Sequence, residues 1–563
     1  MTIFGLEADN DRSVGSQLQS ERAIPEPFVA EWLKDGPARL RSNYTLFREL
    51  VNEARGFLAD GKPALAASWC EIAGFHAAAA HSGLYASPEL EAVIREIAQR
   101  AFGEAGIARG TGLARAGRRI LHVATQVQGT GGLSRMIWRW IEADTNGVHS
   151  VALVRQRRSV PHTLMATVKA SGGRIYDLSS EGPADLFGLA RSLRRVAAGV
   201  DLIILHIDTR DTVPLLAFSS ARERPPIAHL DHADHHMWIG VSIADIAISL
   251  RSSGMELLLS RRGICPERSF VLPIPVPLVK RTLTKAKAKQ MLDIPEQSLL
   301  LVSVARKVKY RNVEGATFAD VHLPFLERWP EARLIVLGSG DLPEWATAQD
   351  RVPGRIRGLP EDNRTDVFYQ AADIYVDSFP FVSITSLLEA GAYGVPLVSR
   401  FPFGAGAEIL GADSPGLTKH MVRATDAAAY GAALDMLAAS PAARERLGAA
   451  TCRSVATFHQ GITWEAALSA IYDAAATLPP VTPDNGRLDV PSFGPPDVFI
   501  PFVHGSSLSR DELVCSQLAL LPARKRLRHW LDLCSRHGLR FGGRDDLLKC
   551  WVPSRLVARL RRA

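Results

Sequence analysis

The chain has 563 residues and a formal charge of +7, with 47% apolar and 22% charged residues. This length is too great for a single hydrophobic core and predicts about three or four folded units. No apolar run is long enough for a membrane helix, and the polar, acidic start lacks the regions of a secretory signal. Six scattered cysteines without a CxxC pair indicate neither a zinc site nor a disulfide framework. We therefore expect a cytoplasmic protein.

The charge is concentrated at the C-terminal end. Residues 521–563 contain twelve Lys or Arg and three Asp, so this segment carries +9 and residues 1–520 together about −2. Four apolar residues of the segment are expected on one helix face: Leu527, Trp530, Leu531 and Cys534. Three interpretations stay open: peripheral contact with an anionic inner membrane face, binding of an anionic glycan, or a solvated arm packed on the body. No nucleic-acid-binding motif accompanies the charge, so we expect no nucleic-acid partner.

The N-terminal part divides into two segments. Residues 1–35 have few periodic apolar positions and are expected to be partly disordered, whereas residues 36–115 are Ala-rich and helical. Ser87 followed by Pro88 is a typical helix start, a capping residue before a proline at the first helical position. The helical region is either a module for an acceptor or a packing appendage.

Residues 116–280 alternate short apolar runs with helical stretches. Continuous apolar runs separated by helices predict buried parallel strands with helical crossovers. The expected strands are 120–124, 150–154, 174–178, 202–205, 227–230 and 246–250, with helices at 133–143 and 184–198. Prolines within 270–276 cannot lie inside a central strand, so this segment is expected to be a linker.

A second alternation occupies residues 281–480. The expected strands are 299–304, 332–337, 355–359, 374–376 and 396–399, and helical sequence runs from 425 to 476. Two successive doubly wound α/β domains predict a ligand site in the cleft they face, beyond the carboxyl ends of the strands. Residues 481–563 follow as a Pro-rich linker and a basic helical extension.

The most informative motif runs from Asp377 to Ser399. A loop after a short strand leads into a helix that begins near Thr385 and Ser386, where backbone N–H groups and hydroxyls form an anion site. Glu389, one turn later, is placed to bind a sugar diol. The alternative is an ordinary loop and helix with Glu389 facing water.

This motif resembles the donor-binding region of GT-B glycosyltransferases, most closely the O-GlcNAc transferase type. The resemblance implies that Thr385 and Ser386 hold a diphosphate and that Glu389 holds the ribose. It also implies that residues 116–280 form the acceptor-side domain and residues 281–480 the nucleotide-sugar-binding domain. Family 4 retaining enzymes are similar too, but Phe381 stands where they carry an earlier glutamate. That departure favours inversion.

Basic residues follow the first strand of the second domain. Arg306 with Lys309 or Arg311 is expected to neutralise a diphosphate leaving group, as the Arg/Lys pair of GT-B enzymes does. No DxD-like motif follows a strand, so we expect no metal and no other cofactor. The alternative is a solvated basic loop.

Glycines mark two further loops. Gly131 and Gly132 resemble the glycine pair that lies beside the donor phosphates in GT-B enzymes, and the pattern is not the GxGxxG of dinucleotide sites. Gly338 and Gly340 resemble the nucleotide loop of the second domain, together with Leu359 at the end of the next strand.

Four histidines and two aspartates lie within residues 229–238. They suggest a zinc site, acid–base chemistry or a purely structural cluster. GT-B enzymes often carry a functional histidine here, so His232 or His235 is expected to be the base or a leaving-group contact. Asp234 or Asp231 would orient it. His206 is a further candidate, although a core histidine with satisfied hydrogen bonds is the simpler interpretation.

The sequence thus predicts a metal-independent, inverting glycosyltransferase, a hexosyl- or N-acetylhexosaminyltransferase. It would move a sugar from a nucleotide diphosphate, by likeness UDP, to a hydroxyl of a glycan or protein. A nucleotide-sugar 2-epimerase of the same architecture and a non-catalytic sugar-nucleotide-binding module remain as alternatives.

Overall fold

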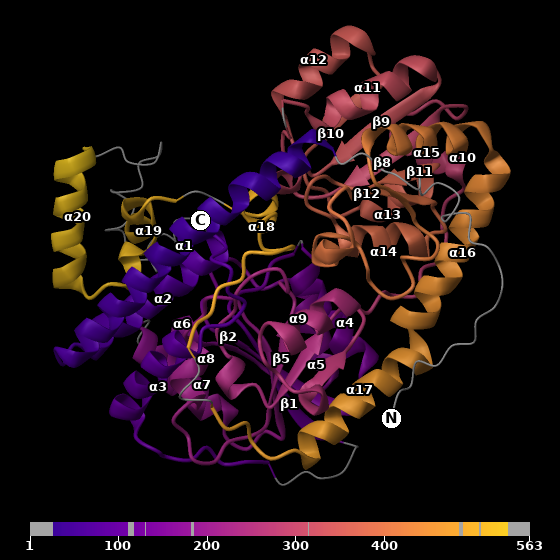
Figure 1. Ribbon diagram of the computed structural model, residues 1–563. Coiled ribbons are helices and arrows are strands. Elements are labelled where there is room, and N and C mark those ends of the chain that lie inside the picture. Colours follow the sequence, from indigo (N-terminus) through magenta and orange to yellow (C-terminus); the bar gives the residue numbers. More distant parts are fainter. Residues whose placement is uncertain are drawn as a thin grey trace. The chain divides into compact units, whose positions relative to one another are not determined.

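The computed structural model describes residues 26–110, 117–129, 131–181, 185–313, 315–483, 488–505 and 508–538. The chain divides into two compact units. The first-sheet unit runs from Trp32 to Pro275 and resumes at Gly461. The second-sheet unit comprises residues 26–31 and those from Val276 to Gln460. Each holds one parallel sheet with helices, of seven and six strands. The chain therefore has the two Rossmann-like sheets of the GT-B fold class, as predicted (Figure 1).

The sheet of the first-sheet unit has the order β3-β2-β1-β4-β5-β6-β7. Its strands are β1 Arg118–Ala124, β2 Gly147–Leu153, β3 Ile175–Asp177, β4 Leu202–His206, β5 Ile227–Asp231, β6 Ile246–Ser249 and β7 Ser269–Val271. Every residue of β4, β5 and β6 is buried, which explains their continuous apolar runs. The expected linker at 270–276 begins with β7, a correction that the prolines allow because β7 ends at Val271, before Pro273.

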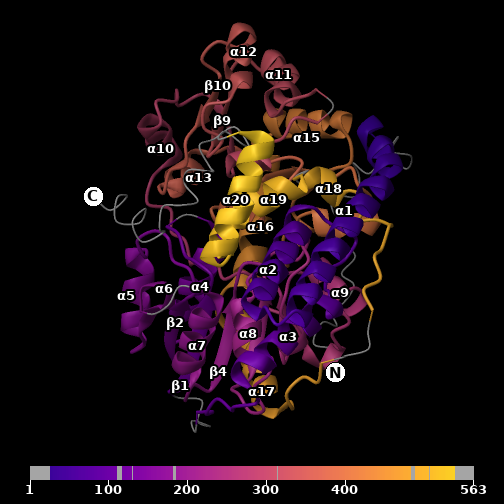
Figure 2. The same ribbon diagram turned by 90° about the vertical axis from the view of Figure 1, so that its left-hand side faces the viewer.

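Helices flank this sheet and include the N-terminal region. They are α1 Pro27–Ala59, α2 Pro63–Ala79, α3 Pro88–Phe102, α4 Gly132–Ala143, α5 His162–Ala170, α6 Leu178–Glu181, α7 Leu186–Ala197, α8 Val213–Phe218 and α9 Ser252–Ser260. The hydroxyl of Ser87 accepts a hydrogen bond from the Leu90 amide (3.1 Å), so α3 begins as predicted. Figure 2 shows α2 and α3 beside α8, and their side chains share one core with β1 and β4. Residues 27–35 are helical, where the sequence predicted partial disorder.

The chain returns to the first-sheet unit after residue 460, earlier than the expected boundary at 480. Trp464 in α17 (Gly461–Thr477) donates a hydrogen bond to the Pro273 carbonyl (2.8 Å), and its ring meets that of Trp140 edge-on. Periodicity identified α17 as a helix but could not reveal which sheet it would cover. The remaining helices of this part are α18 Ile500–Val503, α19 Arg510–Gln517 and α20 Ala523–His537.

Helix α20 differs from the expected amphipathic helix. Leu533 is its fully buried apolar residue and Trp530 and Cys534 pack beside it, whereas Leu527 and Leu531 are 45% and 54% exposed. Most of the basic tail, residues 539–563, lies outside the described residues. Within the described part of the chain, no helix has both the length and the apolar character needed to cross a membrane.

The sheet of the second-sheet unit has the order β10-β9-β8-β11-β12-β13. Its strands are β8 Leu299–Val304, β9 Ala332–Leu337, β10 Ile356–Leu359, β11 Ile374–Val376, β12 Leu397–Arg400 and β13 Val422–Ala424. Its helices are α10 Lys285–Met291, α11 Phe318–Arg328, α12 Pro343–Arg351, α13 Thr365–Ala371, α14 Ile384–Ala392, α15 Ala427–Ala439 and α16 Pro441–His459. The strand order reverses between β8 and β11, and ligands of such sheets bind beyond the carboxyl ends at this point.

Candidate active site

Asp377 organises the loop that joins β11 to α14. Its Oδ1 atom accepts hydrogen bonds from the amides of Ser378 and Ser383, each at 2.9 Å, and its Oδ2 atom accepts one from the Ser399 hydroxyl at 3.1 Å. Burial raises the pKa of Asp377 to about 6. The carboxylate therefore fixes the backbone at both ends of the turn and sets the direction in which α14 starts.

Thr385 and Ser386 lie in the first turn of α14 and are half-buried. The Ser383 hydroxyl donates to the Ser386 hydroxyl at 3.1 Å, so these side chains gather at the helix start. The first amides of a helix have no partner within the helix, and with neighbouring hydroxyls they suit an anion.

Glu389 follows one turn later on the same helix. Its side chain is buried, and its Oε2 atom accepts a hydrogen bond from the Tyr369 hydroxyl at 3.4 Å. This burial excludes the alternative in which Glu389 simply faces water. A buried carboxylate one turn behind a helix start is suited to accepting hydrogen bonds from hydroxyl groups of a ligand.

The basic loop after β8 packs against the loop before α14. The Nζ atom of Lys309 donates to the Val382 carbonyl (2.7 Å) and lies 4.3 Å from the centre of the Phe381 ring. The Arg311 amide donates to the Phe379 carbonyl at 3.3 Å. The two loops that the sequence predicted to act together are therefore adjacent within one unit. Arg306 is exposed at the start of the same loop.

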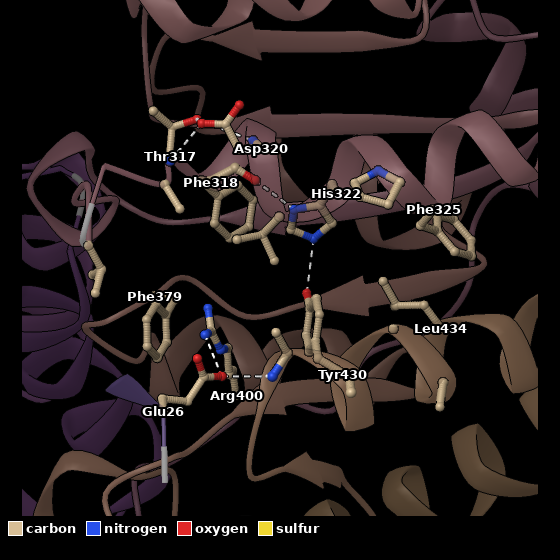
Figure 3. A pocket seen from close by; sticks show the side chains of 18 of the residues that line it. Glu26, Thr317, Phe318, Asp320, His322, Phe325, Phe379, Arg400, Tyr430 and Leu434 are labelled. Atoms are coloured by element: carbon tan, nitrogen blue, oxygen red, sulfur yellow. Dashed lines mark hydrogen bonds and ion pairs between the residues drawn. The ribbon is translucent and has the colours of Figure 1, made fainter. Parts of the chain in front are cut away.

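The side chain of Arg311 lines a cavity and is not grouped with Lys309 at the start of α14. It lines a cavity of about 800 Å³ beside α11 and α15, whose wall includes Phe318, Phe379 and Tyr430 (Figure 3). Burial lowers the pKa of Arg311. Since the lining contains neither Lys309 nor the residues of the α14 start, Lys309 is the better of the two candidates for a diphosphate contact.

The wall of this cavity carries its own polar contacts. His322 shares a hydrogen bond with the Tyr430 hydroxyl (2.9 Å), and Arg400 pairs with Glu26 at 2.7 Å (Figure 3). Sequence reasoning did not find the cavity, because its lining comes from separate helices and loops with no shared motif.

The backbone conformation explains why the loop after β9 carries glycine at position 338. Gly338 has φ of +89°, and a Cβ atom there would lie 2.4 Å from the Ala305 carbonyl oxygen. The amides of Gly338 and Gly340 both donate to the Leu359 carbonyl at 2.9 Å. The loop therefore lies against the residues that follow β8.

Gly131 and Gly132 begin α4 in the first-sheet unit. Gly131 has φ of +103° and precedes the helix, and a Cβ atom there would meet open space. The conformation rather than crowding explains this glycine. Both residues lie in the first-sheet unit, whereas Lys309 lies in the second-sheet unit.

Asp234 in the histidine-rich segment is engaged by Arg251. The guanidinium donates to both carboxylate oxygens, at 2.6 and 2.8 Å, and both side chains are buried. Although burial alone raises the pKa of Asp234, Arg251 holds it below its usual range. His235 Nδ1 lies 3.4 Å from Asp234 Oδ1, a long contact. The main partner of Asp234 is thus Arg251 and not a histidine.

His235 belongs to a larger aromatic and ionic cluster. Its ring stacks on that of His504 with centroids 3.9 Å apart. Nearby in the chain, Asp497 pairs with His81 (3.0 Å) and with Arg261 (2.8 Å). Sequence reasoning missed His81, Asp497 and His504, because no local pattern links residues so far apart in the chain.

His232 is half-buried, whereas His229 and Asp231, which precede it in the histidine-rich segment, are buried. Burial lowers the pKa of His232, and the charge of Asp208 partly opposes this. His229 stacks on Trp238 with centroids 3.8 Å apart, the arrangement of a core residue. Burial raises the pKa of Asp231 to about 7, and Arg262 lies 3.3 Å from its Oδ2 atom. Within the described residues, no group of three or more His, Cys, Asp or Glu side chains is arranged to hold a metal ion.

No protein-family model matches the chain, and no curated protein matches it. Solved structures resemble it at low identity. A glycosyltransferase from Rickettsia africae ESF-5 is 13% identical with a TM-score of 0.47, over 64% of this chain and 99% of that chain. A variant of the Thermobaculum terrenum O-GlcNAc transferase is 18% identical with a TM-score of 0.46, over 80% and 86%. The Neisseria meningitidis UDP-GlcNAc 2-epimerase is 14% identical with a TM-score of 0.43, over 63% and 100%. These likenesses assign no activity.

Proposed function

We propose that the protein is a glycosyltransferase that transfers a sugar from a nucleotide diphosphate, with UDP as the nucleotide. One observation carries the proposal: the Lys309 ammonium group lies against the loop that starts α14, with Glu389 buried one turn further on. The cation and the helix start with its hydroxyls match the diphosphate of a ligand. The buried carboxylate matches the ribose of the same ligand.

In this proposal the α14 start acts on the leaving group. When the bond from sugar to phosphate breaks, negative charge grows on the diphosphate. Lys309, Arg306 and the amides of Thr385 and Ser386 stabilise that charge, and such contacts accelerate the reaction because they are stronger in the transition state than in the ground state. No metal ion is required in this scheme.

The acceptor would be activated by the first-sheet unit. His232 is the preferred base, because its pKa is lowered and it therefore stays neutral at physiological pH with a ring nitrogen able to accept a proton. The acceptor oxygen, once its proton is removed, bonds to the anomeric carbon as the bond to the diphosphate oxygen breaks, and attack from the face opposite the diphosphate gives inversion. His235 is the second choice, since its ring is covered by His504.

Binding and product analysis together test the proposal. Uridine, UMP and UDP are titrated into the full chain by calorimetry. If the site binds the diphosphate, UDP binds more tightly than UMP by at least about tenfold. UDP-sugars are then incubated with glycan and peptide acceptors, and mass spectrometry detects the glycosylated product. Equal binding of uridine and UDP would reject the donor site. An epimerised sugar formed without any acceptor would replace the transferase with an epimerase.

A further inference from the structure

Three buried histidines lie diagonally across the sheet of the first-sheet unit. His122 is in β1, with β2 on one side and β4 on the other. His149 in β2 is opposite Ile120, and His206 in β4 is opposite Ala124. Positions 120, 122 and 124 share one face of β1. From His149 to His122 to His206, each histidine therefore lies two residues closer to the carboxyl ends of the strands than the one before.

The three rings are joined by direct hydrogen bonds. His122 Nε2 is 2.9 Å from His149 Nδ1, and His122 Nδ1 is 2.9 Å from His206 Nε2. All three side chains have 0% exposure. The row is therefore continuous and closed to water, which is more than an isolated core histidine requires.

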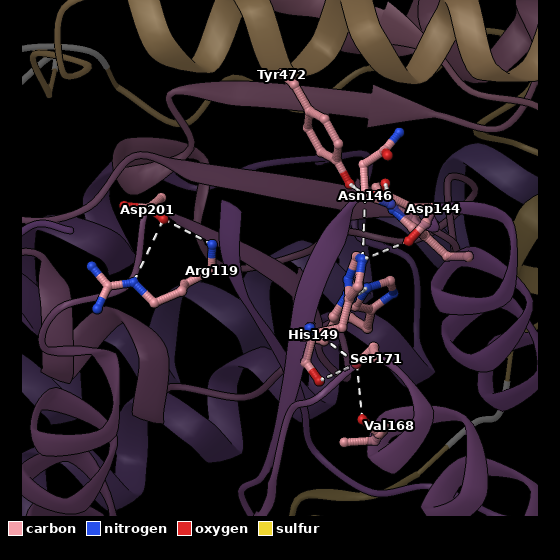
Figure 4. A network of polar contacts seen from close by, with 11 residues as sticks. Arg119, Asp144, Asn146, His149, Val168, Ser171, Asp201 and Tyr472 are labelled. Atoms are coloured by element: carbon pink, nitrogen blue, oxygen red, sulfur yellow. Dashed lines mark hydrogen bonds and ion pairs between the residues drawn. The ribbon is translucent and has the colours of Figure 1, made fainter. Parts of the chain in front are cut away.

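A carboxylate ends the row at the amino-terminal side of the strands. His149 Nε2 lies 3.3 Å from both the Oδ2 atom and the backbone oxygen of Asp144 (Figure 4). The Tyr472 hydroxyl donates to the same Oδ2 atom at 2.6 Å, and Trp140 donates to that hydroxyl at 3.1 Å. Burial alone raises the pKa of Asp144, but the hydrogen bonds from His149 and Tyr472 hold it below its usual range.

This end fixes the tautomer of every ring. Both partners of His149 Nε2 are acceptors, so that nitrogen carries the proton and, in the neutral ring, Nδ1 accepts. His122 must then donate from Nε2 and accept at Nδ1, and His206 must donate from Nε2. The Nδ1 atom of His206 is left as a lone pair, and it is buried without a hydrogen-bond partner among the described residues.

The open end of the row lies at the end of the strand next to the one that leads into the candidate base. His206 is the last residue of β4, and β5, the next strand, ends immediately before His232. Burial lowers the pKa of His206 to about 3, and the charge of His232 adds to this effect. Burial also lowers the pKa of His122. A positive charge is therefore not held at either of these two rings.

We propose that Asp144, His149, His122 and His206 form a directed proton relay that accepts a proton at His206 Nδ1 and delivers it to the His149–Asp144 pair. The relay rests on the proposed function, since it would receive the proton that His232 takes from the acceptor hydroxyl. Its residues are positioning residues: they act through His232 and touch no substrate.

The transfer balances without any other reactant. A proton leaves His232 and bonds to His206 Nδ1, while the proton on His206 Nε2 moves to His122 Nδ1. The proton on His122 Nε2 then moves to His149 Nδ1, which leaves His149 as an imidazolium facing the Asp144 carboxylate. No electrons are transferred, and the reverse sequence resets the row after turnover. The buried ion pair at the far end separates the proton from the product.

Histidine tautomers test the relay without a substrate. The full chain is labelled with ¹⁵N-histidine, and ¹H–¹⁵N spectra are recorded near neutral pH, with the signals assigned from single His→Gln variants. We expect His122, His149 and His206 all to be neutral with the proton on Nε2. An Nδ1-protonated ring at any of the three positions, or a charged ring in the resting protein, overturns the proposal. Because this measurement needs no turnover, its result is independent of the transferase assay.

Kinetics of a matched pair of variants test the transfer itself. In His122→Gln the side-chain amide can donate a hydrogen bond to one neighbouring histidine and accept one from the other. It cannot take up a proton at one atom and release another from a second atom, as an imidazole can. His76→Gln is the control, because His76 is also buried, in α2, and among the described residues its ring bonds only the backbone carbonyl of Asn43 (2.9 Å). We expect His122→Gln to lower kcat by at least about tenfold with the donor KM unchanged, and His76→Gln to leave kcat within about twofold of wild type. Equal kcat values in the two variants, or a loss in His122→Gln confined to KM, overturn the relay.

Discussion

The Nζ atom of Lys309 donates a hydrogen bond to the carbonyl oxygen of Val382, 2.7 Å away. Lys309 follows β8 and Val382 precedes α14, so this contact joins the two strand ends at which the sheet order reverses. The charge of Lys309 is thus held beside the loop that starts α14.

Replacing Lys309 with Met should weaken the binding of UDP and leave the binding of uridine nearly unchanged. We expect a loss of about 1.5–3 kcal/mol, the usual worth of a hydrogen bond to a charged group. Lys307→Met is the control, because Lys307 lies in the same turn and is exposed. Calorimetric titration of both variants measures the effect. Equal losses in the two variants would mean that the loop contributes only general positive charge.

Glu389→Gln should remove the preference of the site for UDP over 2′,3′-dideoxy-UDP, which lacks both ribose hydroxyls. The carboxylate can accept two hydrogen bonds from the ribose hydroxyls, and Gln offers only one acceptor oxygen. We expect wild type to bind UDP more tightly than 2′,3′-dideoxy-UDP, and the variant to bind them within about threefold of each other. Unchanged discrimination in a folded variant would show that another group reads the ribose.

The sheets and the α14 motif were predictable because they depend on local sequence. Buried parallel strands leave continuous apolar runs, and Asp377, Ser383 and Ser386 lie within one short segment. The orientation of the basic side chains was not predictable. Lys309 and Arg311 are two residues apart, yet Lys309 contacts the loop before α14 and Arg311 lines the cavity beside α11. Lys309 is the last residue of a 3-10 turn and Arg311 lies beyond it, so the backbone changes direction between them.

Arg251→Met should destabilise the protein strongly. The change leaves the buried Asp234 carboxylate without its bidentate partner, and an uncompensated buried charge costs about 3–5 kcal/mol. The double variant Arg251→Met/Asp234→Asn should recover most of that loss. Urea unfolding followed by tryptophan fluorescence measures both. A single variant as stable as wild type would show that the ion pair is not needed to hold the histidine-rich segment.

Asp489→Asn should change how stability depends on pH. The Asp489 carboxylate accepts hydrogen bonds from the Ser87 hydroxyl and the Glu89 amide, and burial raises its pKa to about 6. The folded state therefore holds this proton more tightly than the unfolded state, so the contribution is full below about pH 4 and is lost as the pH rises through 6. Relative to wild type, the Asn variant should gain stability between about pH 4 and pH 7. A stability difference that stays constant over this range contradicts the assignment.

Long-range partners explain what the sequence could not reveal about the histidine cluster. The pattern at 229–238 indicated titratable chemistry, but His235 is covered by His504 from the C-terminal part of the chain. Asp234, expected to orient a histidine, is held by Arg251 because a buried carboxylate is stabilised most by a bidentate guanidinium. Such pairings depend on the packing of distant segments, which periodicity does not encode.

A crystal structure of the full chain with UDP tests the central claim most directly. The account predicts the β-phosphate at the amides of Thr385 and Ser386, within hydrogen-bond reach of Lys309, and the ribose hydroxyls on Glu389. UDP bound elsewhere, for example in the cavity beside α11 and α15, with the start of α14 empty, would contradict it.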